Sequence, residues 1–251
     1  MNFKYKAELK INGKKVHSTV ELDWLKLICN RLCGQAKCGV LTRATAYDTN
    51  LGRICETENV IERSYSWDES SSRYDVLCKW LGTAEQSGEV NTVMIFVKDS
   101  ENNYHMISTF EGLSESVNAN DEIYIEYHLY IYPSSEDKNA SKELADELTD
   151  PSKEKIPSID KVQIVYQDVV QKTLTGKSST DVQPYDNGVV EGYDAIIEFL
   201  DESTDEYSWD KLRFIETVDN VLYYEGDVTP DSKAAEEKAK FRLRVRNVRP
   251  K

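Results

Sequence analysis

The stretch that decides the fold is FKYKAELKING, residues 3–13. Charged residues alternate along it with the apolar residues Phe3, Tyr5, Ala7, Leu9 and Ile11. A repeat of two residues is typical of a β-strand that buries one face. Asn12-Gly13 follows, the preferred pair for a tight type I′ turn, and residues 16–22 then fit a returning strand. The sequence therefore predicts an antiparallel hairpin at this point.

The apolar spacing changes directly after the hairpin. Between Asp23 and Gly34, large apolar side chains recur at the three- and four-residue intervals of an α-helix. Asp23 is a suitable N-cap, and Gly34 lies where a helix C-cap is expected. One short helix is therefore predicted to pack against the first strands.

Alternating segments separated by turn-forming residues follow the helix. They cover residues 40–47, 74–81, 91–97, 105–110 and 122–132. Short strands with no helices between them favour a β-sandwich or barrel over a parallel α/β sheet. The expected fold class is mainly β, an antiparallel β-sandwich with one short N-terminal helix, followed by a second, smaller β domain.

The composition shifts between residues 134 and 158 to Ser, Glu, Asp, Lys and Pro, without aromatic residues. This predicts an interdomain linker, in which Lys142 to Leu148 is compatible with a helical turn. Strand-like segments then resume at residues 162–166, 188–200, 212–217, 221–226 and 241–248. We therefore expect an N-terminal sandwich over 1–133, an acidic and polar linker over 134–158, and a C-terminal β domain over 159–251.

Charge narrows the range of partners. The 251 residues carry a formal net charge of -14, which repels nucleic-acid phosphates and anionic membranes at long range. The sequence contains no uncharged apolar window of the roughly 18 residues that a membrane span requires. Its first residues lack the apolar core of a signal peptide. No nucleic acid and no membrane are expected as partners, and synthesis in a cytoplasm is expected.

Five cysteines occur in the first third of the chain: Cys29, Cys33, Cys38, Cys55 and Cys78. Their odd number and the missing signal peptide favour reduced thiols. The spacing Cys29-x3-Cys33-x4-Cys38 is the closest to a metal-ligand pattern, but structural zinc sites usually use Cys-x2-Cys pairs, and no second pair follows. We expect small buried core residues and no metal.

The sequence lacks signatures of catalysis. His17, His105 and His128 lie in strand-like segments without a nucleophile motif beside them. The segment Gly188 to Gly192 lacks the lysine of a phosphate-binding loop. The acidic run Asp201 to Glu206 lacks the residue order of a calcium loop. No enzymatic activity and no cofactor are therefore expected.

The last residues reverse the charge of the chain, since no acid follows Glu237. Apolar residues alternate there with Lys240, Arg242, Arg244 and Arg246, which predicts a strand with one basic face. Such a face suits an acidic neighbour, including a second copy of this chain. We take these four residues as a hypothetical assembly interface; the alternative is pairing with carboxylates of the same domain.

Three places in the first half carry a resemblance: LTRATA at residues 41–46, VNTVMIF at 90–96, and ISTF at 107–110 followed by NDEIYIEY at 120–127. In this order they resemble the β-sandwich modules of tailed-bacteriophage virion proteins of the tail-fibre, collar or ring type. The resemblance covers residues 40 to 133 and departs from the usual pattern at Lys98, where a Gly or a small polar residue is more common. The resemblance assigns no catalytic role to any residue of this chain.

The resemblance implies a structural protein of the virion, made in the host cytoplasm. Such a protein assembles in multiple copies at the tail, neck or collar as a ring-type scaffold. Its expected partners are other virion proteins and copies of itself in a homo-oligomer. The alternative is a non-catalytic adhesin or binding module for carbohydrate or protein, with the aromatic residues Trp67, Tyr74, Trp80 and Trp209 as its platform.

Overall fold

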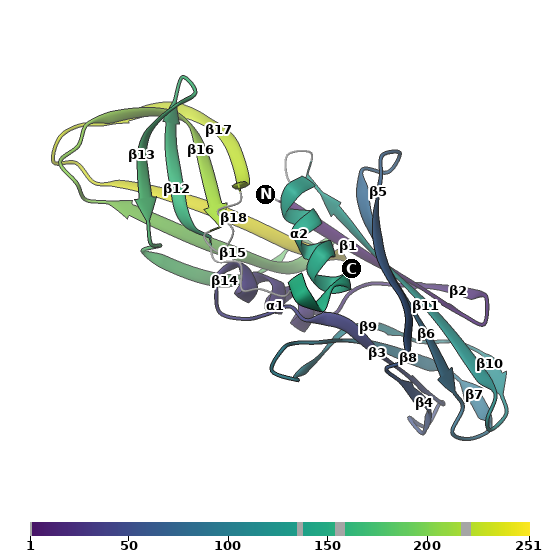
Figure 1. Cartoon of the computed structure of the whole chain (residues 1–251). Helices are drawn as coiled ribbons and strands as arrows, with labels where there is room; N and C mark the ends of the chain where they lie inside the picture. The colour runs from purple at the N-terminus through teal and green to yellow at the C-terminus, as the bar shows by residue number, and fades with distance from the viewer. Residues whose placement is uncertain (1, 135–137, 154–158, 217–221) are drawn as a thin grey trace.

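The computed structural model describes residues 2–134, 138–153, 159–216 and 222–251. Strands dominate these residues, and two α-helices lie among them (Figure 1). The expected fold class, mainly β with sandwich architecture, is confirmed. The described part of the chain contains one more α-helix than the sequence predicted.

One eight-stranded sheet runs through both halves of the chain. Its path is β14 (Ser179–Asp186), β15 (Val190–Asp201), β18 (Ala239–Pro250), β1 (Asn2–Ile11), β11 (Glu122–Pro133), β6 (Arg73–Thr83) and β5 (Val60–Asp68), with β2 (Lys14–Ser18) paired to β1. The link between the halves is the parallel pair of β1 and β18, in which Phe3 lies opposite Asn247. The other neighbouring strands of this sheet are antiparallel.

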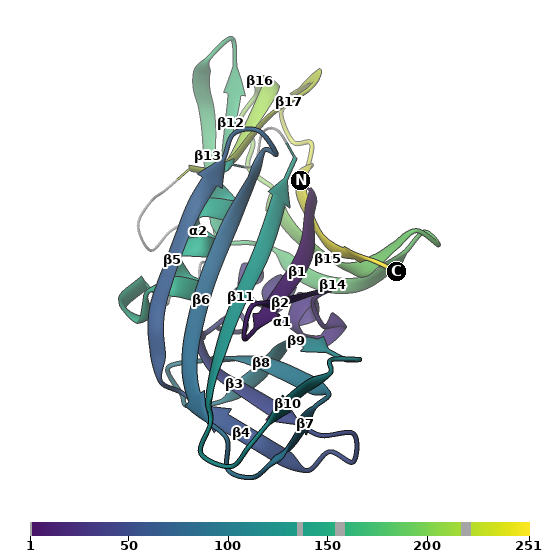
Figure 2. The same ribbon diagram turned by 90° about the vertical axis from the view of Figure 1, so that its right-hand side faces the viewer.

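A four-stranded sheet faces the first half of this large sheet. It consists of β4 (Arg53–Thr57), β3 (Val40–Tyr47), β8 (Thr92–Lys98) and β9 (Tyr104–Phe110). The short pair β7 (Gly88–Val90) and β10 (Glu115–Val117) lies near its end (Figure 2). Trp80 on β6 is fully buried, and its indole Nε1 donates to the Thr42 carbonyl at 2.9 Å. These contacts make the first half a β-sandwich.

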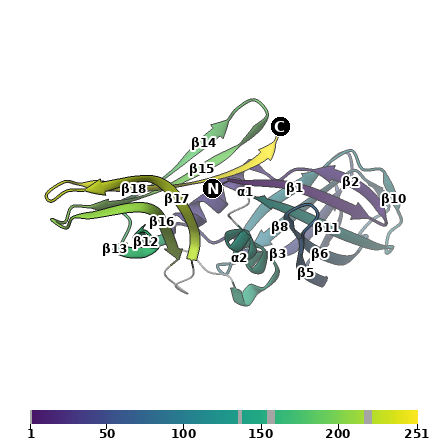
Figure 3. The same cartoon turned by 90° about the horizontal axis from the view of Figure 1, so that it is seen from above.

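A second four-stranded sheet faces the other half of the large sheet (Figure 3). It consists of β13 (Val169–Thr175), β12 (Ile159–Tyr166), β16 (Tyr207–Glu216) and β17 (Leu222–Lys233). Phe214 on β16 meets Phe199 on β15 with ring centroids 6.0 Å apart, and Trp209 meets Phe241 on β18 at 5.2 Å. The structure thus consists of two sandwiches that share one sheet.

Two helices, α1 (Leu22–Leu32) and α2 (Lys138–Thr149), lie where the sandwiches meet (Figure 1). Helix α1 contacts β15 and β18 as well as β9, and α2 contacts β3, β5, β6 and β11 as well as β17. Arg31 of α1 and Glu147 of α2 form a bidentate ion pair, and each side chain is 1% exposed. The pair joins the two helices inside the junction.

The first hairpin agrees with the sequence. Asn12 and Gly13 have φ values of 46° and 86°, as a type I′ turn requires. The returning strand is shorter than expected, because α1 begins at Leu22 with Glu21 as its N-cap instead of Asp23. The isolated bridge between Val20 and Ser108 then connects this segment to β9.

The segment expected as a linker is largely structured. Helix α2 lies within residues 134–158, and Ala140, Leu144 and Leu148 form a buried stripe at four-residue spacing. The expectation that this segment has little to contribute to a core is therefore wrong for α2; residues 135–137 and 154–158 lie outside the described residues. Residues 1–133 and 159–251, expected as separate domains, share both the large sheet and one hydrophobic cluster.

Candidate binding and assembly surfaces

The predicted assembly residues lie on the solvent side of β18, next to β15. The antiparallel register places Arg246 opposite Asp194 and Arg242 opposite Glu198. Arg246 forms two hydrogen bonds to Asp194, at 2.7 and 2.9 Å, and Arg244 lies 3.7 Å from the same carboxylate. Glu198 pairs with both Arg242 and Lys240. All four basic residues therefore have carboxylate partners within this chain.

The ion pairs between β18 and β15 shift the pKa of a carboxyl group. Hydrogen bonds from Ser179, Lys240 and Arg242 lower the pKa of Glu198 to about 2. Arg242 and Arg244 nevertheless keep about half of their side chains exposed, 50% and 51%. The internal pairing left open by the sequence is thus present, and any assembly contact at this face would have to form over paired charges.

An open groove lies further along the outer side of the large sheet, lined by residues of β1, β2, β6, β11 and the end of β18. Its volume is about 620 Å³, within the range of small-molecule sites. Its lining contains four permanent cations and one carboxylate: Lys6, Lys15, Arg73, Lys251 and Glu8. A locally basic groove is therefore built into a strongly acidic protein.

Glu8 lies at the bottom of this groove with only 5% of its side chain exposed. Its Oε2 atom lies 2.7 Å from Lys15 Nζ and accepts a hydrogen bond from Tyr130 at 3.1 Å. Burial alone would raise the pKa of Glu8, but the hydrogen bonds from Lys15 and Tyr130 lower it. The closest contacts of Glu8 to Lys15, His17 and Tyr130 are made by Oε2, which leaves Oε1 with capacity to accept a further hydrogen bond.

Arg73 and two tyrosines form one wall of the groove. The guanidinium of Arg73 stacks 3.9 Å from the ring centroid of Tyr130 and donates to the Tyr132 hydroxyl at 2.7 Å. Lys6 Nζ lies 5.8 Å from the ring of Tyr132. Within the described residues Lys6 has no carboxylate partner. This wall therefore presents a cation that no carboxylate of the described residues neutralises.

A charged network lies beside the groove, on the same side of the sheet. His128 stacks on Tyr130 with ring centroids 5.9 Å apart, and its two nitrogens lie 2.9 Å from Asp75 and from Glu126. Burial alone would lower the pKa of His128, but hydrogen bonds to the two carboxylates raise it. The hydrogen bond from Lys10, together with His128, lowers the pKa of Glu126 to about 2 against the effect of burial.

His128 should make stability depend on pH above its ordinary pKa of 6.5. Because the folded pKa is raised, the stabilisation is fully present below that value and is lost as pH rises through the folded pKa. We expect the free energy of unfolding to fall over this window, and to fall less in a His128→Gln variant. Urea unfolding at several pH values measures both, and an imidazole NMR titration midpoint at or below 6.5 would contradict the assignment.

The histidines do not form a nucleophilic site within the described residues. His17 lies 3.7 Å from Glu8, His105 lies 3.1 Å from Asp99, and His128 has the two partners given above. No hydrogen bond in the described chain joins a histidine ring to a serine or cysteine side chain. The arrangement consists of ion pairs and supplies no base–nucleophile pair.

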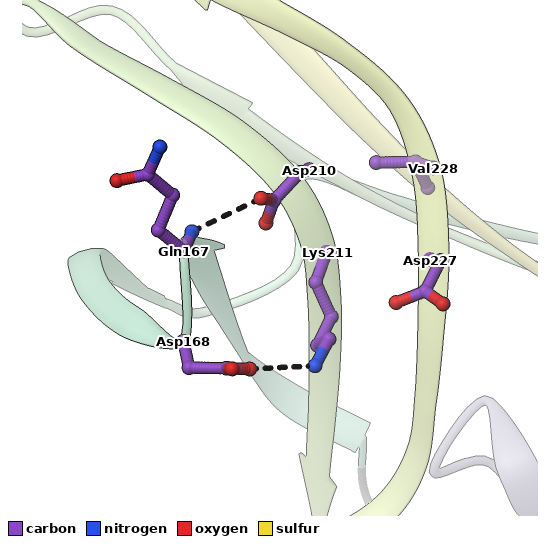
Figure 4. Close-up of a pocket in the computed structure, with 6 residues that line it drawn as sticks. All are labelled: Gln167, Asp168, Asp210, Lys211, Asp227 and Val228. Carbon is purple, nitrogen blue, oxygen red and sulfur yellow. Dashed lines mark hydrogen bonds and ion pairs between the residues drawn. The ribbon is translucent and has the colours of Figure 1, made fainter.

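A smaller pocket of about 330 Å³ lies at the turn between β12 and β13, against β16 and β17 (Figure 4). Lys211 pairs with Asp168 at 2.8 Å, and the backbone of Gln167 donates to Asp210 at 3.0 Å. In the described parts of the chain, no three His, Cys, Asp or Glu side chains are placed to hold a metal ion. The acidic run after β15 is also engaged internally, since Asp201 accepts a hydrogen bond from Tyr207 and Asp205 pairs with Lys172.

The five cysteines are buried thiols. Cys29 accepts a hydrogen bond from Asn247 at 3.3 Å, whereas Cys38 donates to Glu147 at 3.2 Å. Burial raises the pKa of Cys29 and of Cys78 to about 12, and that of Cys33 to about 11. A thiol that stays protonated is a poor nucleophile, so the cysteines act in the structure as small core residues.

The adhesin alternative requires four exposed aromatic residues, and this prediction is wrong for two of them. Trp80 is 0% and Tyr74 is 4% exposed, and both belong to the core. Trp67 and Trp209 are partly buried and pack against that core. The tyrosines of the groove are alternate residues of one strand in the sequence, and Lys251 belongs to the basic C-terminal segment, but nothing in the sequence indicated that Arg73 lies beside them.

Neither described helix combines the length and apolar character needed to cross a bilayer. Comparisons with protein-family models, with curated proteins and with solved structures give no match to this chain.

Proposed function

We propose that this chain is a non-catalytic structural protein that assembles in multiple copies, of the kind found at the tail, neck or collar of tailed-phage virions. The observation that carries the proposal is the two open edges at the ends of the strand path of the large sheet. Within the described residues, β5 pairs only with β6, and β14 pairs only with β15. An unpaired edge presents backbone donors and acceptors to a further strand.

The two edges differ, and this determines the geometry of assembly. A contact between β5 of one copy and β14 of the next is heterologous, and repeating it produces a ring or a filament. Pro184 in β14 cannot donate a hydrogen bond, so the pairing would use Ser179 to Gln183. On β5, the register shift at Ile61 confines a regular edge to Glu62 to Asp68.

The resemblance to phage modules adds support from the first sandwich. Residues 41–46, 92–96 and 107–110 lie on the adjacent strands β3, β8 and β9, and residues 122–127 lie on β11 in the facing sheet. Phe110 and Ser108 contact Tyr127 across the two sheets. The segments that carry the resemblance therefore build the two layers of one sandwich. Lys240, Arg242, Arg244 and Arg246 remain proposed as a secondary contact face.

Proline substitutions in β14 test the edge contact. Successive residues of an edge strand direct their backbone groups alternately towards the partner strand and towards solvent. One of the variants Thr180→Pro and Asp181→Pro should therefore lose a backbone hydrogen bond to β15 and become less stable. The other should keep the wild-type melting temperature. We expect the fold-preserving variant to sediment as a monomer under conditions in which the wild type forms oligomers.

The adjacent variant provides the matched control, because it carries the same substitution one position away. Analytical ultracentrifugation and thermal melting together assign the two positions. Oligomers that persist in the fold-preserving variant would exclude β14 from assembly. A wild type that stays monomeric up to its solubility limit would overturn the proposed function.

A further inference from the structure

The basic groove over β1, β2 and β11 has features that edge-to-edge assembly does not use. It lies on the outer side of the sheet and not at the β5 or β14 edge. Its rim contains Lys6, Arg73 and Lys251, while Glu8 lies at its bottom. These cations gather on one side of a protein with a net charge of -14, although Lys15, Lys251 and Arg73 each have a carboxylate nearby.

Two polar atoms of residues that line the groove have no hydrogen-bond partner in the described chain. Arg73 Nε and Thr19 Oγ1, both on lining residues, are buried without a hydrogen bond in the described chain. The nearest carboxylate to Arg73 Nε is that of Asp68 at 3.7 Å, which is too far for a hydrogen bond. Buried polar groups are normally satisfied by protein, water or ligand. Both atoms are covered by protein, so the accessible cation of the groove that has no carboxylate partner within the described residues is Lys6.

We propose that this groove binds an acidic saccharide, with the anionic group between Lys6 and Arg73 and a sugar hydroxyl donating to Glu8 Oε1. A carboxylate or phosphate on the sugar suits the two cations, because charge-assisted hydrogen bonds are the strongest available there. Tyr132, which contacts both cations, offers ring surface to the apolar face of the sugar. Oε1 of Glu8 is the acceptor at the bottom of the groove.

The volume of the groove, about 620 Å³, matches a short saccharide better than a single inorganic ion. Lys15 is already neutralised by Glu8 at 2.7 Å, and Lys251 is paired with Asp186 at 2.5 Å. Arg73 has Asp68 at 3.7 Å, so the binding energy should depend most on Lys6. Attraction between the exposed charges should also weaken with salt, since screening acts over about 10 Å at 0.1 M.

Calorimetry on the full chain with four probes tests the proposal: a short oligogalacturonide, glucose 6-phosphate, an uncharged malto-oligosaccharide and inorganic phosphate. We expect at least one acidic sugar to bind, the uncharged sugar to fail and inorganic phosphate to bind more weakly than the sugar phosphate. The acidic sugar that binds with the higher affinity shows whether the groove prefers a carboxylate or a phosphate. Raising the salt concentration should weaken the binding that is seen.

Two variants of β1 make the test specific. Lys6→Ala should weaken the acidic sugar by about tenfold or more, the range expected for a lost charge-assisted hydrogen bond. Lys4→Ala is the matched control, because Lys4 lies two residues away on the same side of β1 and outside the groove lining. It should leave affinity within about twofold. Arg73→Lys keeps the charge but loses the planar stack on Tyr130, and it should also weaken binding.

Four results would overturn the proposal: no binding of either acidic sugar, equal binding of the uncharged sugar, equal binding of inorganic phosphate and sugar phosphate, or equal losses in Lys6→Ala and Lys4→Ala. None of these results bears on assembly through β5 and β14, which is read by sedimentation.

Discussion

Replacing Glu147 with alanine is expected to lower the free energy of unfolding by about 3–5 kcal/mol, because it leaves an unpaired buried charge on Arg31. Both side chains are 1% exposed. Burial alone would lower the pKa of Arg31, but the Glu147 carboxylate raises it above its ordinary value, so the cation stays charged in the junction. Urea unfolding should also show one transition, since the sandwiches share a sheet and a core.

The exposed ion pair on the same helix provides the control. Lys142 pairs with Asp146 at 2.8 Å with 52% of the lysine side chain exposed, and such i,i+4 pairs contribute about 0.3–0.5 kcal/mol. Lys142→Ala should therefore change stability little. Replacing both buried partners, as Arg31→Met with Glu147→Leu, should restore most of the loss. A single Glu147→Ala variant within about 1 kcal/mol of wild type would show that the pair does not hold the junction.

The second large effect is expected at Trp80, which joins the two layers of the first sandwich. Trp80→Ala should lower the free energy of unfolding by about 3–5 kcal/mol, because it removes a fully buried ring and leaves a cavity. It also leaves the Thr42 carbonyl without the indole donor at 2.9 Å. Denaturant unfolding with fluorescence or circular dichroism measures the loss.

Two further variants separate the causes. Trp80→Phe keeps most of the apolar volume and isolates the lost hydrogen bond, for which we expect about 1–3 kcal/mol. Ile61→Ala, on neighbouring β5, removes a side chain that is 51% exposed and should change stability by about 0.5 kcal/mol or less. A loss at Trp80→Ala no larger than that at Ile61→Ala would contradict the packing described for this sandwich.

Local sequence patterns predicted the strands that bury one clean face. Buried apolar residues recur at every second position along β1, along β11 and along β18 as far as Val245, and β1 with its Asn12-Gly13 turn was predicted closely. β5, β13 and β14 were missed, because strands at sheet edges are largely exposed and their sequences need not alternate. β14 even contains Pro184, which argues against a central strand.

Helix α2 and the groove could not be predicted for a different reason. The buried stripe of α2 is short, and its strongest contact, between Glu147 and Arg31, joins residues 116 positions apart. The groove likewise depends on register: Lys6 lies opposite Tyr130 across β1 and β11, and Arg73 reaches the same tyrosine from β6. Charge alternation showed the basic face of β18 but not the β15 carboxylates that neutralise it.

Hydrogen exchange at low and high protein concentration is the most direct test of edge-to-edge assembly. We expect backbone amides of β5 and β14 to become protected as concentration rises, while those of β4 and β13, one edge strand from each of the two four-stranded sheets, exchange as before. Exchange from β5 and β14 that does not change with concentration, in samples shown by sedimentation to be oligomeric, would contradict this expectation.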